Sequence, residues 1–419
     1  MYYSKNKSGL SYRQILLVCA CTLPVSALSG SLVALFLWLL DLVTNIRWQH
    51  LWLLYLLPLS GIAIHFLYKL WGKTAEAGNA LIIDEIHSPG SGVPPRMAPL
   101  VLVTTIITHL FGGSAGREGT AVQIGGSMAA LLGRWFALPA DALRILLMAG
   151  VAAGFGAVFG TPLTGTIFAL EVISFGNIRY RAFLPCLIAS FAGDEVCAAW
   201  GIRHTAYHIA YLPQHLFAGV GLPCSFSEFS VVLLAGAASG VAAYLFIHLT
   251  HTIKAAGNKV FSNRLWLMPL VGGVIIVALT LALHTADYLG LGVTSPGGIS
   301  IVNAFHPGGV GRWSWALKLV FTAITIGSGF KGGEVTPLFF IGATLGASIA
   351  AALGAPIDLL AGIGFIAVFA GAANTPLACS IMGLELFGPI HFIYFVVACF
   401  VAYWCSGKHS IYKKHMATH

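Results

Sequence analysis

Several apolar runs in this chain are too short to cross a membrane as helices, and no other feature restricts its fold as strongly. Hydrophobic residues make up 58% of the chain and charged residues 9%, whereas soluble domains carry roughly 25% charge, so the surroundings are a lipid bilayer. Residues 97–112, 120–133, 143–158 and 161–175 are apolar pieces of about a dozen to sixteen residues. Helices of that length reach about 18–24 Å, whereas a hydrocarbon core is about 30 Å thick. We therefore expect these helices to end inside the membrane.

The longer apolar runs complete the picture of an all-α polytopic membrane protein. Residues 14–44 form one segment, which we expect to be interrupted at Pro24 and Gly30, and residues 50–71 form a second. The 49 glycines fit helices that are broken and closely packed. Helix ends at membrane depth leave unpaired backbone groups, which are tolerated only where protein buries them or where they line an ion pathway.

Charge and ligand-type residues narrow the function classes. The net charge of +8 is spread over the ends and the loops, which gives no sign of a nucleic-acid partner. Because basic residues at both ends mark cytoplasmic segments, we expect both termini to be cytoplasmic and residues 203–224 to lie outside. The histidines of that loop match no metal motif, and the eight cysteines lie mostly in apolar runs, so we expect no metal and no cofactor.

One glycine-rich loop carries an acid directly before an apolar helix. GSAGREGTAVQIGG, residues 113–126, places Arg117 and Glu118 side by side between Gly116 and Gly119. Only 14 acidic residues occur in the chain, and an acid inside apolar sequence is costly unless it has a partner or a function. The glycines leave backbone N–H groups uncovered at a helix N-terminus, where the dipole favours an anion. In a soluble protein a simple helix cap would be the better reading, but membrane depth makes the loop a candidate anion site.

The second half of the chain repeats the first. A shift of 214 residues places GSAGREGTAVQ, 113–123, on GSGFKGGEVTP, 327–337. The same shift places AGFGAVFGTPLTGTIFALE, 153–171, on AVFAGAANTPLACSIMGLE, 367–385. One ungapped offset that serves two separate motifs indicates an internal duplication.

Duplicated halves with interrupted helices usually bring their helix N-termini together at the midplane, around an anion. The Glu118 loop and the Glu334 loop would then face one site. The repeat partner of Glu118 is Gly332, so the acid occurs in one half only. This asymmetry argues for a function of Glu118. Glu171 and Glu385 are repeat partners of each other, which predicts a shared packing role.

Taken together, these motifs resemble the CLC family of anion channels and proton-coupled anion exchangers over essentially the whole chain. GREGT resembles the family's loop with the gating glutamate, GGEVTP its counterpart in the second half, and GKHSIY, 407–412, the start of the last helix, whose tyrosine faces the anion. The resemblance implies an inverted repeat of tilted and half-spanning helices, and a homodimer in which each subunit has its own pathway.

Departures from the chloride members resemble the fluoride-type branch of bacterial exchangers. Thr120 stands where chloride members usually have proline after GREG, and Val172 stands where chloride exchangers have an internal proton-relay acid. GSGVP, 90–94, resembles the first anion-binding loop, but the repeat offset would place its Ser91 on Phe305. Because Gly78 instead falls on Gly292, we place that loop at AGNAL, 77–81, with Asn79 in place of the usual serine.

The resulting hypothesis is a fluoride/proton antiporter that exports fluoride, with no enzymatic activity. Glu118 would gate the pathway and transfer the proton, and the Asn79 amide, backbone N–H groups and the Tyr412 hydroxyl would bind the anion. For Arg117 we favour a structural role, because charges inside a membrane usually pair. Glu334 either lies on the proton path or is the structural partner of Lys331. Thr336 either lines the anion path with its hydroxyl or caps the start of a helix. The predicted anion-binding residues are Asn79, Gly119, Thr120, Glu334, Val335, Thr336 and Tyr412, and the predicted supporting loop residues are Gly116, Arg117, Gly332 and Gly333.

The predicted organisation has four segments, in a bacterial plasma membrane with fluoride, protons and lipid as partners. They are a cytoplasmic segment, 1–13, a first repeat, 14–224, a second repeat, 225–406, and a C-terminal segment, 407–419. The nearest alternative is a chloride/proton exchanger or a passive anion channel of the same fold. An intramembrane enzyme is disfavoured because no HExxH, GxSxG or paired-aspartate motif is present, and a non-transporting scaffold would leave the asymmetry of Glu118 unexplained.

Overall fold

The computed structural model describes residues 12–88, 90, 92–174, 180–212, 226–295 and 297–412. The regular secondary structure in these ranges is entirely helical. The only strand-like pairing there is one isolated bridge between Gly116 and Gly333. The α-helices of the first half are α1 Tyr12–Gln49, α2 Leu57–Leu67, α3 Asn79–His87, α4 Met97–Leu110, α5 Glu118–Trp135, α6 Ala140–Phe159, α7 Pro162–Ser174 and α8 Phe183–Ala199. Those of the second half are α9 Phe226–Val260, α10 Leu267–Leu283, α11 Ser314–Gly327, α12 Val335–Leu353, α13 Ile357–Ala373, α14 Pro376–Phe387 and α15 Phe392–Ser406.

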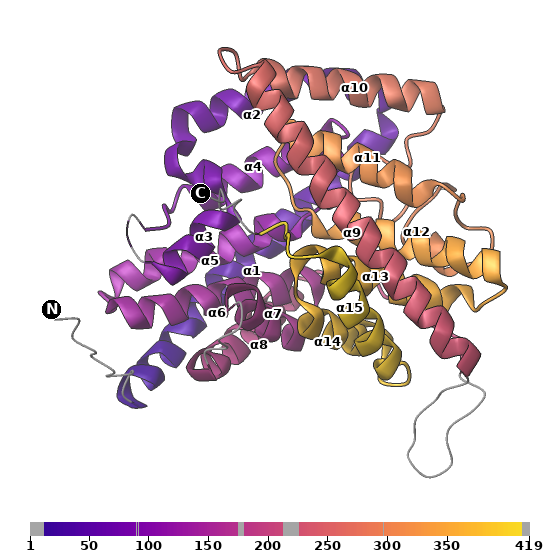
Figure 1. The fold of residues 1–419 in the computed structure, drawn as a ribbon. Coiled ribbons are helices and arrows are strands. Elements are labelled where there is room, and N and C mark those ends of the chain that lie inside the picture. Colours follow the sequence, from indigo (N-terminus) through magenta and orange to yellow (C-terminus); the bar gives the residue numbers. More distant parts are fainter. Residues whose placement is uncertain are drawn as a thin grey trace, which may run out of the picture.

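The two halves lie side by side and are built from the same packing pairs. In the first half α1 packs on α6 and α8, and in the second half α9 packs on α13 and α15. The pair α7 and α8 recurs as α14 and α15, and the pair α5 and α6 recurs as α12 and α13. Figure 1 shows the first half, from indigo to magenta, beside the second half, from rose through orange to yellow. The duplication predicted from the motifs therefore organises the packing.

A reciprocal exchange of carboxylates joins the halves. Glu171 on α7 accepts the backbone N–H groups of Leu377 and Ala378, at 3.0 and 2.8 Å, at the start of α14. Its repeat partner Glu385, on α14, accepts the N–H groups of Leu163 and Thr164, both at 2.8 Å, at the start of α7. A two-fold axis between the halves produces this relation, because it repeats each contact with the two halves interchanged. The predicted packing role of this pair thus takes the form of mutual helix capping.

Two expectations about helix length are wrong. The first apolar run is not interrupted, because α1 continues from Tyr12 to Gln49 through Pro24 and Gly30. Gly30 instead allows a close approach of helices, since a Cβ there would lie 2.6 Å from the Gly193 carbonyl oxygen of α8. The piece at 143–158 is also longer than expected, because α6 has 20 residues and takes in a polar first turn with Asp141.

The described residues include helices long enough to span a membrane and helices too short to do so. Six are long and apolar enough to cross a membrane, among them Ala140–Phe159 and Val335–Leu353. The helices α4, α7, α11 and α14, by contrast, have 12 to 14 residues. The loops that follow α4 and α11 meet between the two halves, where Gly116 pairs with Gly333.

Candidate functional site

The carboxylate of Glu118 is buried between the starts of two helices, one from each half. Glu118 is the first residue of α5 and is 1% exposed. Its Oε2 accepts the backbone N–H of Arg117 at 3.1 Å, and its Oε1 accepts the hydroxyl hydrogen of Thr336, in the first turn of α12. Helix N-termini carry partial positive charge, so both ends favour an anion at this point.

A backbone pair fixes the two glycine-rich loops against each other. Gly116 and Gly333 exchange N–H to carbonyl hydrogen bonds of 2.6 and 2.8 Å. A Cβ on either glycine would lie 2.6 Å from Oε2 of Glu118. Both positions therefore need glycine because the carboxylate occupies the space that a side chain would fill. The structure thus brings the Glu118 loop and the Glu334 loop together, as the repeat predicts.

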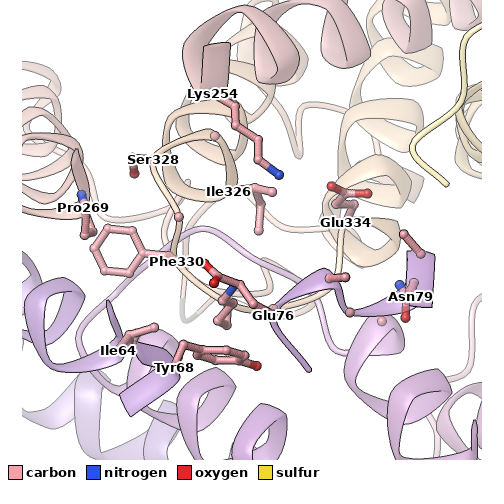
Figure 2. Close-up of a pocket in the computed structure, with 18 of the residues that line it drawn as sticks. Ile64, Tyr68, Glu76, Asn79, Lys254, Pro269, Ile326, Ser328, Phe330 and Glu334 are labelled. Carbon is pink, nitrogen blue, oxygen red and sulfur yellow. The ribbon is translucent and has the colours of Figure 1, made fainter. Parts of the chain in front are cut away.

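A vestibule of about 590 Å³ reaches this junction from one side of the molecule. Figure 2 shows Asn79 and Glu334 at one end of it, and Tyr68, Glu76 and Lys254 along its walls. The predicted residues Gly119, Gly332, Gly333 and Tyr412 also line it. Lys331 lies with its Nζ 4.3 Å from the centre of the Tyr68 ring, a cation–π contact. The vestibule therefore connects the solvent with Gly119 in the Glu118 loop.

Asn79 lies at the inner end of the vestibule because of the turn before it. Gly78 adopts φ 57° and ψ −131°, a conformation that favours glycine, and α3 begins at Asn79 directly after it. A Cβ on Gly119 would lie 3.2 Å from Nδ2 of Asn79, so the amide faces the Glu118 loop closely. Oδ1 of Asn79 is buried, and no described residue forms a hydrogen bond with it. An amide in this position can present a donor to an anion beside Gly119.

Comparison with known proteins places the chain in a family. A family model described as voltage gated chloride channel matches residues 60–407. The chain belongs to the CLC family. A relative from Pseudomonas syringae pv. tomato, named chloride/fluoride channel protein, is 46% identical over 401 residues, which cover 94% of this chain and 85% of the relative.

Solved structures agree with this assignment. A crystal structure of a CLC-type fluoride/proton antiporter is 35% identical, with a TM-score of 0.89, and the match covers 96% of this chain and 98% of that one. A slow cyanobacterial Cl−/H+ antiporter, at 20% identity, a TM-score of 0.78 and a coverage of 96% of this chain and 97% of that one, shares the fold. The resemblance and the fold class inferred from the motifs are confirmed.

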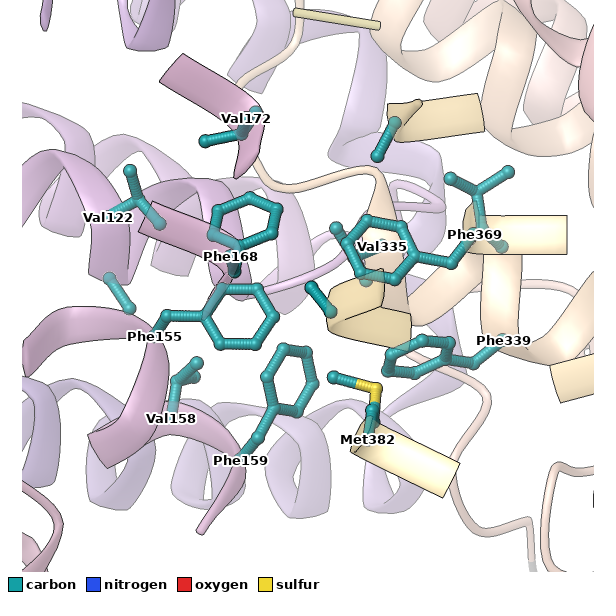
Figure 3. Packing of buried hydrophobic residues seen from close by; sticks show 14 of the residues in the cluster. Val122, Phe155, Val158, Phe159, Phe168, Val172, Val335, Phe339, Phe369 and Met382 are labelled. Carbon is teal, nitrogen blue, oxygen red and sulfur yellow. The ribbon is translucent and has the colours of Figure 1, made fainter. Parts of the chain in front are cut away.

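The other predicted anion-binding residues of this CLC chain differ in what they contact. The Thr120 hydroxyl pairs with the hydroxyl of Thr105 on α4 at 2.8 Å. Val335, the first residue of α12, packs among buried apolar side chains (Figure 3). Tyr412 is 8% exposed, and its ring stands edge-on to Phe168 at 5.8 Å. Among the hydroxyls of Thr120 and Thr336, only that of Thr336 reaches the Glu118 carboxylate.

A cluster of phenylalanines beyond Glu118 is the main feature that the motifs did not reveal. Figure 3 shows Phe155, Phe159 and Phe168 of the first half facing Phe339 and Phe369 of the second. Ring centroids lie 4.3 Å apart for Phe155 and Phe168, and 5.3 Å apart for Phe159 and Phe339. The i, i+4 spacing of Phe155 and Phe159 was the available signal, but such spacing is also typical of an ordinary core.

Two further sequence inferences concern Val172 and Ser91. Val172 is buried and, with Asn79, Phe168 and Tyr412, lines a small cavity of about 10 Å³, whose described lining includes no carboxylate. Ser91, the competing candidate for the first anion loop, lies outside the described residues, as do Lys413 and the chain beyond it.

Proposed function

We propose that this CLC protein is a fluoride/proton antiporter that exports fluoride across a bacterial plasma membrane and acts as a transporter rather than an enzyme. The observation that carries the proposal is the Glu118 carboxylate, which is buried where the N-termini of α5 and α12 converge and is held by an N–H and an O–H donor. A site that stabilises a carboxylate in this way also stabilises a small inorganic anion.

Competition between the carboxylate and the anion would couple the two fluxes. While Glu118 is ionised it occupies the donors of Arg117 and Thr336, so an anion cannot use them. Protonation removes the charge that those donors and the helix ends stabilise, and the side chain is then free to leave. An anion that enters from the vestibule then takes the place of the Glu118 side chain, so the movement of the anion requires the movement of the proton.

Selectivity for fluoride is supported by the residues around the anion position and by a relative. Fluoride is small and strongly hydrated, so its pathway must replace water by strong donors, and Asn79 offers an amide close to Gly119. The 35% identical structure is that of a CLC-type fluoride/proton antiporter. Neutral HF crosses bilayers and releases fluoride inside a cell, and an inward proton gradient would drive that fluoride out.

The basic residues on the vestibule side support an orientation of the protein in the membrane. Lys254 lines the vestibule, and Tyr412 near the C-terminus lies at its inner end. Cytoplasmic segments carry the excess of lysine and arginine, so we place the vestibule and both termini in the cytoplasm. We also propose a homodimer surrounded by lipid, for which the molar mass of the purified protein in detergent is the direct measurement.

A second candidate is an anion channel or a chloride exchanger of the same fold. It is favoured by the name of the 46% identical relative, which includes both chloride and fluoride and the word channel. A channel would carry anions without moving protons, and a chloride exchanger would move protons with chloride at least as fast as with fluoride.

The test is anion efflux from liposomes that hold the purified protein, read with a fluoride electrode beside a pH electrode, with chloride for comparison. We expect fluoride to leave at least about tenfold faster than chloride, a difference of about 1.4 kcal/mol in the barrier, and protons to enter with it. Glu118→Gln should abolish proton uptake because an amide does not titrate. Asp141→Asn, an exposed position on α6 whose side chain is 63% accessible, is the matched control and should behave as wild type.

Three results would contradict the proposal. A chloride flux equal to or faster than the fluoride flux would indicate a chloride exchanger. Fluoride flux without proton uptake in the wild-type protein would indicate a channel. Proton uptake that persists in Glu118→Gln would remove Glu118 from its assigned role.

A further inference from the structure

A third cavity, also much smaller than the vestibule, lies on the other side of Glu118 from the vestibule. Its volume is about 20 Å³, and its lining includes Arg117, His204, Tyr207 and Thr336. Arg117 precedes Glu118 and lines this cavity, whereas Gly119 follows Glu118 and lines the vestibule. The proposed orientation therefore makes the small cavity external. A space of this size holds about one water molecule, for which roughly 10–15 Å³ is needed.

His204 connects this cavity with the external surface. It lies in the loop after α8, and its side chain is 21% exposed. Its Nε2 is 3.9 Å from Oδ1 of Asp194, whose side chain is 23% exposed, and has no hydrogen-bond partner among the described residues. Gly160 has φ 70° and makes room for the ring, because a Cβ at Gly160 would collide with the imidazole. The fold thus holds an imidazole with one edge near solvent and a place in the cavity wall.

Thr336 connects the cavity with Glu118. Its side chain lines the cavity, and its hydroxyl donates to Oε1 of Glu118. A hydroxyl that donates a hydrogen bond can accept another one at the same time, so a water in the cavity can bond to Thr336. One water in the cavity can therefore link His204 to Thr336, and through the Thr336 hydroxyl to the Glu118 carboxylate.

We propose that His204, assisted by Asp194, transfers protons between the external solution and Glu118. The inference rests on the proposed antiport, and it adds the residue that serves the external side. One ring nitrogen of His204 takes a proton from Asp194 or from solvent, and the other gives a proton to the cavity water. The water gives a proton to the Thr336 oxygen as the Thr336 hydroxyl proton moves to Oε1 of Glu118. One proton is transferred in total, and no bond between heavier atoms changes.

The charged groups around His204 define its resting state. Arg117 at the start of α5 and Asp194 on α8 face it, and Glu195 and Glu385 lie near Asp194. Burial, reinforced by the charge of Arg117, lowers the pKa of His204 to about 4. The ring is therefore neutral at pH 7, with one nitrogen ready to accept a proton and the other carrying one, and the imidazolium forms only during transfer.

The test compares proton-coupled fluoride efflux in wild type, His204→Gln and His204→Ala, at external pH 6 and pH 8. Proton transfer by a placed side chain contributes roughly 10²–10⁴-fold to a rate, so we expect His204→Gln to slow exchange by about tenfold or more at pH 8 and less at pH 6. The ratio of fluoride to protons should not change, because Glu118 still couples them. Imidazole added outside should restore the rate of His204→Ala. His208→Gln, an exposed histidine in the same loop, is the matched control.

Each outcome decides the proposal. Exchange by His204→Gln at the wild-type rate at both pH values would overturn it while leaving the antiport intact. A slow His204→Ala protein that elutes normally in size exclusion but does not respond to imidazole would assign His204 a purely structural role. Absence of coupled exchange in the wild-type protein would refute the proposed function, and this inference with it.

Discussion

At the scale of single residues, the partners of a carboxylate determine what it can do. Glu118 accepts bonds from Arg117 and Thr336 at the junction of the two halves, where an anion could take its place. Glu171 and Glu385 use their carboxylates to cap helices. Glu334 lies in the vestibule wall, which leaves its assignment to the proton path a proposal. The four acids stand in similar apolar sequence, but only Glu118 accepts hydrogen bonds at the helix starts of both halves.

The hydroxyl of Thr336 gives a prediction at this scale. Thr336→Val keeps the shape of the side chain but removes the donor to Glu118, and a hydrogen bond to a charged group contributes roughly 1.5–3 kcal/mol. We expect fluoride/proton exchange to fall by about tenfold or more, and Thr336→Ser to retain most of it. Thr344→Val is the matched control on α12, because the buried Thr344 hydroxyl donates only within its own helix, to the carbonyls of Phe340 and Ile341 at 2.8 and 3.3 Å. An unchanged exchange rate in Thr336→Val would mean that this hydroxyl does not hold the carboxylate.

At the scale of helices, the exchange of caps between α7 and α14 stabilises the contact between the two halves. Unpaired N–H groups at the start of a helix are costly at membrane depth, and each half supplies the acceptor that the other needs. Glu385 accepts one bond more than Glu171, because the Thr164 hydroxyl also donates to it at 2.5 Å. The two caps are therefore related by the repeat but are not equal in strength.

This difference predicts an order of stability. Glu171→Gln and Glu385→Gln should each destabilise the protein, by about 1–3 kcal/mol, because an amide offers one acceptor oxygen instead of two. Glu385→Gln should lower the thermal midpoint in detergent more than Glu171→Gln. Glu195→Gln, an exposed position on α8, should leave the midpoint unchanged. Equal midpoints for all three variants and the wild type would rule out a stabilising role of the caps.

At the scale of the whole molecule, the two sides of the site are unequal in access. The vestibule has about 590 Å³ and the small cavity on the other side of Glu118 about 20 Å³. Phe159, Phe339 and Phe365 line the small cavity and narrow that side. Solvent therefore reaches the centre of the molecule from the vestibule side, and the other side passes ions only if these rings move.

Cysteine labelling tests this arrangement. In a background without the exposed Cys405 and without Cys224 of the 203–224 loop, Ala77→Cys on the vestibule wall should react with a membrane-impermeant thiol reagent only from the cytoplasmic side. His208→Cys, exposed on the opposite loop, should react only from outside. Oriented cells and inverted vesicles provide the two conditions. Reaction of both positions from the same side would overturn the proposed topology.

The sequence by itself determined the features that local patterns encode. These are the membrane setting, the duplication with its offset from Gly113 to Gly327, the family, and the loop with Glu118. Apolar runs gave the helices, but their ends shifted because polar first turns such as that of α6 belong to the helix. The expected break at Pro24 failed because a proline in a membrane helix is tolerated when neighbouring helices pack around it.

Only the tertiary structure decided which distant groups share a site. The bond between Thr336 and Glu118, the opposed phenylalanines Phe159 and Phe339, and the placement of His204 beside Arg117 all join residues far apart in the chain. No local spacing encodes such contacts, because they depend on how the two halves pack about their axis. The chain specified the parts of the candidate site, and the packing of the repeats set their partners.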